Sequence, residues 1–114
     1  MDIEIRTRGF SPTPALRAYV ERRLAFALDR HEERVAGVRV TLADVNGPRG
    51  GHDKSCRVDM RLRGGRTVRA SALTADAYDA VATAVHRAAR GVARALERER
   101  ATTLELLWLA RALS

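Results

Sequence analysis

The chain has 114 residues, 46% of them hydrophobic, and a formal net charge of +7. This length and apolar content indicate one folded domain with a single core and argue against a disordered tail. The basic excess favours a polyanionic partner, such as a nucleic acid or an anionic membrane surface.

The first elements in chain order are a strand and a helix. Residues 2–8 alternate apolar and polar side chains, which predicts a half-buried strand. Thr13 and Pro14 predict a helix start, because threonine caps free backbone N–H groups and proline fits the first helical turn. We expect this helix to run to about Glu33. Its buried stripe consists of Leu16, Val20, Leu24 and Ala27.

Three further strands are expected after Gly37. Residues 38–45, 55–63 and 66–73 each alternate in the same way, and the glycine-rich residues 46–54 between the first two read as a loop. Gly64 and Gly65 predict a two-residue hairpin turn. The side chains expected to face the core are Val38, Val40, Leu42, Cys56, Val58, Met60 and Leu62.

Thr74 is expected to cap a second, long helix that runs to about residue 100. The order β-α-β-β-β-α and the single apolar face of each strand predict an α+β fold. In this fold two helices pack on one face of a four-stranded sheet. The first two strands are parallel if they are neighbours.

Residues 101–114 form a short apolar tail after the α+β domain of residues 1–100. We expect one separate short helix here, beginning after Thr102 or Thr103. Two interpretations stay open for Leu104, Leu107 and Trp108: packing onto the chain's own domain, or weak self-association and partner docking. Glu105 and Arg111 are the tail's only charged residues, so residues 1–100 carry the entire +7.

The same features predict a cytoplasmic protein. The start of the chain lacks the basic and apolar regions of a secretion signal, and no run is apolar enough to span a membrane. Cys56 is the one cysteine, which excludes an internal disulfide and fits a reducing compartment.

The second helix carries the clearest signal for a binding site. Arginines recur at its exposed positions, within an arc of about 80° roughly opposite the apolar side, with almost no acid between them. Like charges one turn apart destabilise a helix, so the pattern favours a polyanion-binding surface over an ordinary solvated face. The arginines concerned are Arg87, Arg90, Arg94 and Arg98.

Other basic residues give weaker signals. The first helix carries Arg22, Arg23 and Arg30 among several acids, a mixture that is by itself typical of a solvated helix. Arginines on the bare face of the sheet are expected to form surface pairs with acids on neighbouring strands. Arg49 and Lys54 belong to the glycine-rich loop. It is not a nucleotide-phosphate loop, because a strand follows it, but it suits contact with RNA.

Catalysis, a metal site and a cofactor are not expected. His52, Asp53 and Cys56 are too few and too irregularly spaced for zinc. The sequence shows no nucleophile beside a base and no isolated pair of carboxylates.

Two separated segments carry a resemblance to a known family. They read "TPALRAYVERRLAFALDRH" followed by "VAGVRVTL", and "VRASALTADAYDAVATAVHRAARGVARAL". Both resemble the ribosome hibernation-promoting factor and ribosome-associated inhibitor family, over roughly residues 2–100. The loop at residues 46–54 is longer than in short members. The tail is too short for the C-terminal domain by which long members pair two ribosomes, so the likeness is to the short form.

The resemblance implies a protein that binds the small ribosomal subunit in its mRNA and tRNA channel during stress. It would contact rRNA through basic residues of both helices and block translation sterically. Two alternatives stay open: a general double-stranded RNA-binding module, and a non-RNA adapter that docks through the C-terminal tail. The expected rRNA-binding residues are Arg22, Arg23, Arg30, Arg49, Lys54, Arg87, Arg90, Arg94 and Arg98.

Overall fold

The computed structural model describes residues 1–45 and 53–114. Its sheet has the strand order β1-β2-β3-β4, with β1 parallel to β2 and the other neighbours antiparallel. The elements are β1 (Asp2–Arg8), α1 (Pro14–Ala27), a 3-10 turn η1 (Glu32–Arg34), β2 (Val35–Asp44), β3 (Lys54–Leu62), β4 (Thr67–Thr74) and α2 (Ala77–Leu113).

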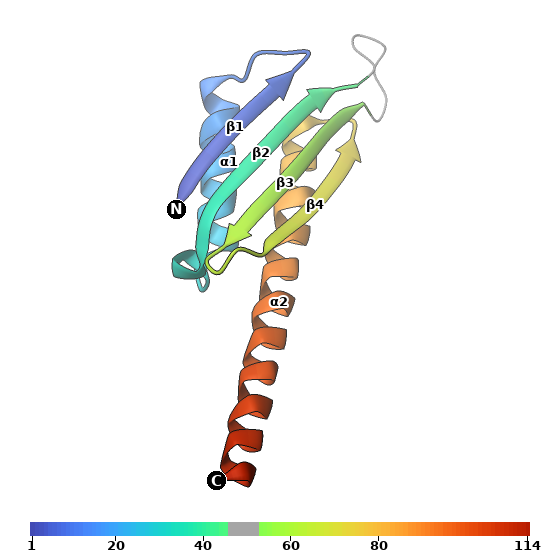
Figure 1. Ribbon diagram of the computed structural model, residues 1–114. Helices are drawn as coiled ribbons and strands as arrows, with labels where there is room; N and C mark the ends of the chain where they lie inside the picture. Colours follow the sequence, from blue (N-terminus) through green and yellow to red (C-terminus); the bar gives the residue numbers. More distant parts are fainter. Residues whose placement is uncertain (46–52) are drawn as a thin grey trace.

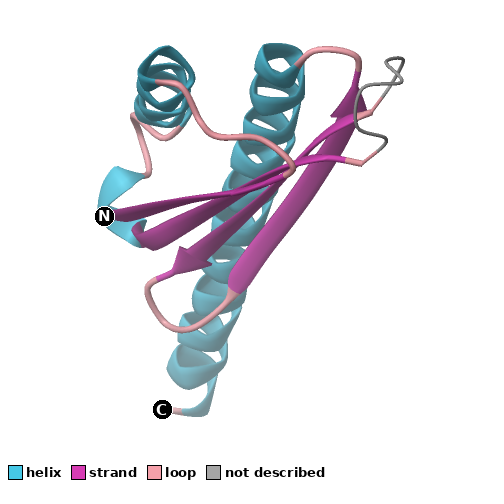
Figure 2. Cartoon of the chain, turned by 90° about the horizontal axis from the view of Figure 1, so that it is seen from above, coloured by secondary structure: helices cyan, strands magenta, loops and turns pink. Residues whose placement is uncertain are grey.

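Both helices cover the same face of the sheet, and the other face is open (Figures 1 and 2). α2 packs against β3 and β4, and α1 lies beside α2. The predicted α+β fold is therefore confirmed. All seven strand side chains expected to face the helices are buried. Burial raises the pKa of the Cys56 thiol to about 12.

α1 is shorter than predicted. It ends at Ala27, not near Glu33, and the Leu28 N–H makes its last bond, to the Leu24 carbonyl at 2.9 Å. The chain must reverse here because Val35 already pairs with Leu62 in the sheet. Successive turns and η1 bridge the two elements, and periodicity alone does not reveal that reversal.

The strand boundaries also differ from the prediction. β2 begins at Val35, so Gly37 lies inside the strand, beside a register shift. The β3–β4 connection is a three-residue loop, since the Leu62 N–H donates to the Arg66 carbonyl at 2.7 Å. Gly64 and Gly65 have φ values of 104° and 102°, a region that L side chains rarely adopt.

The start of α2 is capped by Asp76, not by Thr74. The Asp76 carboxylate accepts a hydrogen bond from the Tyr78 N–H at 3.2 Å. The Thr74 hydroxyl bonds to the backbone of Asp76, donating to its carbonyl at 2.6 Å. Thr74 therefore shapes the turn that precedes the cap.

α2 is one continuous helix through Leu113, so the expected separate tail helix is wrong. Residues 92–113 contain neither proline nor glycine. Thr102 and Thr103 alone are too weak as helix breakers, because threonine costs only about 0.7 kcal/mol or less in a helix interior. Residues 97–114 are all exposed, and this end of α2 projects beyond the sheet (Figure 1).

Gly91 allows α2 to approach β4 closely. A Cβ atom at this position would lie 2.6 Å from Cγ1 of Val68. Val68 is β-branched and cannot easily rotate away. The helix–strand distance therefore depends on the missing side chain.

We predict that Gly91→Ala lowers the free energy of unfolding by about 1 kcal/mol, although alanine is the better helix former. In a Val68→Ala background the same substitution should raise it by up to about 1 kcal/mol, because the clash is gone. Urea unfolding of the four variants measures this coupling. Stabilisation by Gly91→Ala in the unaltered chain would contradict the close approach.

Candidate nucleic-acid interface

Arginines on the open sheet face are already paired with acids, as the sequence predicts. Glu4 accepts from Arg6 Nε at 2.7 Å and from Arg39 Nε at 3.1 Å. These two hydrogen bonds lower the pKa of Glu4. Asp59 likewise pairs with Arg69 and with Arg57, the latter at 3.4 Å. Much of the positive charge on this face is therefore compensated within the protein.

Arginines of α2 have a different environment. Arg90, Arg94 and Arg98 are exposed, and within residues 1–45 and 53–114 none of them has an ion-pair partner. Arg87 donates from Nη1 to the Ser71 carbonyl of β4 at 2.9 Å, which fixes the side chain but leaves its charge uncompensated. Positive charge on this surface is thus available to a ligand.

Three of these α2 arginines line a hollow of about 630 Å³ between α2 and the edge strand β4. Two arginines of the β4 region, Arg66 and Arg69, complete the rim, and Val68, Ala70, Gly91 and Ala95 contribute apolar surface. No carboxylate lines this hollow among the described residues. We call it the basic hollow; its charged residues are Arg66, Arg69, Arg87, Arg94 and Arg98.

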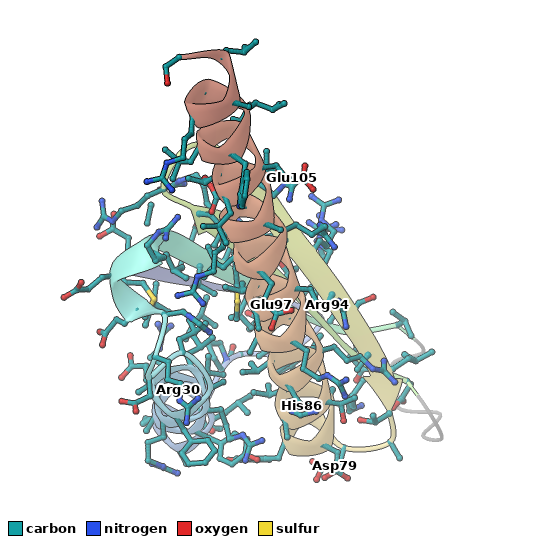
Figure 3. All side chains as sticks on the ribbon, turned by 90° about the horizontal axis from the view of Figure 1, so that it is seen from below. Arg30, Asp79, His86, Arg94, Glu97 and Glu105 are labelled. Atoms are coloured by element: carbon teal, nitrogen blue, oxygen red, sulfur yellow. The ribbon has the colours of Figure 1, made fainter. Side chains whose placement is uncertain are left out.

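On the opposite side of α2, facing the end of α1, the charges are mixed. A groove of about 820 Å³ there is lined by Arg30, Arg34 and Arg100, but also by Glu97 and Glu99. Arg34 Nη2 lies 2.9 Å from Glu99 Oε2. Figure 3 shows Arg94 on the β4 side of α2, with Glu97 and Arg30 on the side toward α1. The two flanks of one helix therefore differ in charge.

The α1 arginines lie outside the basic hollow. The Arg22 guanidinium lies 5.9 Å from the centre of the Tyr19 ring, and Tyr19 meets Tyr78 of α2 edge to face at 5.0 Å. The tyrosine contact joins the middle of α1 to the first turn of α2. Arg23 Nε is buried without a hydrogen-bond partner in the described part of the chain.

Lys54 is held by two acids. Its Nζ lies 2.8 Å from Asp44 Oδ2 and 3.3 Å from Oδ1 of the buried Asp53. The hydrogen bond with Asp44 raises the pKa of Lys54 most. Its charge is thus engaged within the protein. Arg49, the other expected loop contact, lies outside the described residues.

The sequence pattern does not predict that arginines of the β4 region line the basic hollow. Strand alternation places Arg69 on the bare face of the sheet and gives no indication that Arg66 belongs to a binding surface. The position of Arg66 directly after the two turn glycines is a signal that it stands at an exposed end of the sheet. Arg66 lies near Arg94 and Arg98 only because α2 packs closely against β4. The periodicity of the sequence does not reveal that distance.

Among residues 1–45 and 53–114, no three His, Cys, Asp or Glu side chains are grouped closely enough to hold a metal ion. The helices in this described part of the chain lack an apolar stretch of membrane-spanning length.

Residues 3–100 match the protein family described as Sigma 54 modulation protein / S30EA ribosomal protein. The chain belongs to this family. The S30EA family comprises ribosome-associated translation regulators that are not enzymes. The resemblance seen in the sequence is thereby confirmed, and so is the expectation that the protein is not an enzyme.

The solved structures that resemble this S30EA protein include the following two. The N-terminal domain of Protein Y from Thermus thermophilus is 30% identical, with a TM-score of 0.68, over 82% of this chain and 98% of that one. A ribosomal subunit interface protein from Coxiella burnetii is 20% identical, with a TM-score of 0.72, over 85% of this chain and 99% of that one, and it supports the fold alone. No curated protein sequence matches the chain.

We predict that Lys54→Met lowers the free energy of unfolding at neutral pH, because Asp53 then stays buried without its cation. Lys54→Arg keeps the positive charge, so it should lower the free energy of unfolding by less than Lys54→Met does. The raised pKa of Lys54 means that its contribution is present below pH 10.5 and declines as the pH rises further. Urea unfolding at neutral and strongly alkaline pH checks both statements; equal stability of Lys54→Met and the unaltered chain would contradict them.

Proposed function

We propose that this chain binds small-subunit rRNA in the mRNA and tRNA channel and promotes ribosome hibernation under stress. The observation that carries this proposal is the set of uncompensated arginines on α2, of which Arg87, Arg94 and Arg98 line the basic hollow. Membership of a family described as a ribosomal protein supports the ribosome as the target.

The chemistry of the basic hollow suits an RNA backbone. Each phosphate that an arginine neutralises releases counterions, so binding gains affinity and becomes dependent on salt. A guanidinium can also bind a phosphate through two parallel hydrogen bonds and stack on unpaired bases, which suits irregular rRNA. The apolar surface formed by Val68 and Ala70 lies between the charged groups and can accept a base or a ribose.

The open sheet face is less suited to RNA binding than the basic hollow. Four of its arginines are already paired with Glu4 or Asp59, so fewer of them are free to replace counterions of the RNA; these four are Arg6, Arg39, Arg57 and Arg69. Arg22, Arg23 and Arg30 on the α1 side extend the proposed contact area beyond the hollow. Arg49 and Lys54 remain predicted contacts, with the Lys54 charge already shared by two acids.

Inhibition in this proposal is steric and needs no chemical step. A domain held by its arginines against channel rRNA occupies space that mRNA and tRNA require. One continuous core shared by the helices and the sheet supports this mode of inhibition, because a close-packed domain resists deformation.

We predict that a triple variant, Arg90→Gln, Arg94→Gln and Arg98→Gln, binds purified small subunits at least about a hundredfold more weakly at physiological salt. The slope of log K against log salt should fall by about three, one for each lost phosphate contact. Filter binding or co-sedimentation at several salt concentrations measures both quantities.

The matched control carries Arg6→Gln, Arg39→Gln and Arg57→Gln on the open sheet face. It has the same net charge, +4, because three of the seven net positive charges are removed in each variant. We expect the control to bind within about threefold of the unaltered chain. If the two triple variants lost the same affinity for small subunits, net charge alone would explain binding, and the proposed α2 surface would be wrong.

We also predict that a chain truncated after Arg100 keeps its affinity for small subunits within about threefold, because residues 101–114 lack excess charge and none of them is buried in the domain. Binding of a short RNA duplex, measured in parallel, should be much weaker than binding of subunits. Comparable affinity for both would favour a general double-stranded RNA module, and loss of subunit binding on truncation would favour an adapter that docks through the tail.

A further inference from the structure

The end of α2 exposes an unusual amount of apolar surface. Its six large apolar side chains are between 55% and 88% exposed. Together they expose on the order of 700 Å² of apolar surface. We call residues 101–114 the apolar tip; its large apolar residues are Leu104, Leu106, Leu107, Trp108, Leu109 and Leu113.

These side chains surround the helix, whereas a surface helix carries them as one stripe. At about 100° per residue, Leu104 and Trp108 share one side, while Leu106 and Leu113 lie on the other. A helix that is apolar all round is normally buried. No other part of the described chain covers it, since every residue of the tip is exposed.

The charges of the chain indicate what covers the tip. Residues 1–100 carry the entire +7, and the tip contains one acid and one base, Glu105 and Arg111. These two residues stand three positions before and three positions after Trp108. An antiparallel pair of tips centred on Trp108 therefore places Glu105 of each copy opposite Arg111 of the other. A parallel pair would place like charges together.

Distance also favours an antiparallel pair. Ala95 is the last buried residue of α2, and about 20 Å of helix separates it from Trp108. Antiparallel tips therefore hold the two basic domains about 40 Å apart, several times the Debye length of about 8 Å. Repulsion between the domains is then largely screened, whereas parallel tips would bring them side by side.

The tip carries a shallow groove into which a large side chain of another copy can pack. Leu104, Leu107, Trp108 and Arg111 line a hollow of about 320 Å³. In a two-fold symmetric pair the same surface of both copies meets, so each groove faces the large Trp108 side chain of the other copy. Trp108 is the residue type that most often anchors such contacts.

We propose that two copies of this chain associate through antiparallel apolar tips centred on Trp108. The association does not depend on the proposed RNA binding, because the basic hollow and the tip share no residue.

Sedimentation equilibrium of the full chain tests the association. We expect a species of twice the 12.6 kDa chain mass, with a dissociation constant in the micromolar range. Trp108→Ala should weaken it about thirtyfold or more without changing the circular dichroism spectrum. A chain that stays monomeric up to about 1 mM, well above a micromolar dissociation constant, would overturn the proposal.

Charge reversal tests the antiparallel register. Glu105→Arg and Arg111→Glu should each weaken the dimer about tenfold, because each turns two attractive contacts into repulsive ones. The double variant should return to within about threefold of the unaltered chain. Glu97→Arg is the matched control, with the same charge change on an exposed residue outside the tip, and should leave the dimer intact. A dimer in which the double variant fails to recover would refute the antiparallel register.

Discussion

The close packing of α2 against β3 and β4 is the constraint on which the rest of the structure depends. The buried face of α2 consists largely of small residues, among them Ala84, Ala88 and Ala95, and Gly91 removes the last obstacle at Val68. Because the helix lies so near the edge strand, arginines on its flank meet those at the start of β4. A bulkier helix face would separate the two sets, and the basic hollow would divide into two unrelated surface patches.

The surfaces of this chain differ less in the number of arginines they carry than in how many of those arginines are paired with the protein's own acids. The open sheet face and the flank of α2 near α1 both carry several arginines, but Glu4, Asp59 and Glu99 neutralise part of that charge. On the flank near β4, Arg69 alone has such a partner among the described residues, Asp59, and the α2 arginines there have none. Counterion release depends on charges that the protein has not already paired, so composition alone is a poor guide to the binding face.

Period-two and helical patterns were sufficient for the architecture and for the core of β2 and β3, because burial on one face imposes those periods directly. They failed where the outcome depends on contacts between elements. The early end of α1 follows from the pairing of Val35 with Leu62, and the continuity of α2 past Thr102 follows from the absence of any strong breaker. The role of Arg66 depends on a distance between a helix and a strand. None of these three features can be predicted from the periodicity of one segment of the sequence.

The burial of Cys56 has a consequence for a protein expected to act under stress. A thiol with a pKa of about 12 is almost entirely protonated at neutral pH, and the thiolate is the form that peroxides and electrophiles attack. The side chain is also fully covered by the helices. Oxidation of this thiol would therefore require the domain to open first, so Cys56 is protected as long as the fold is intact.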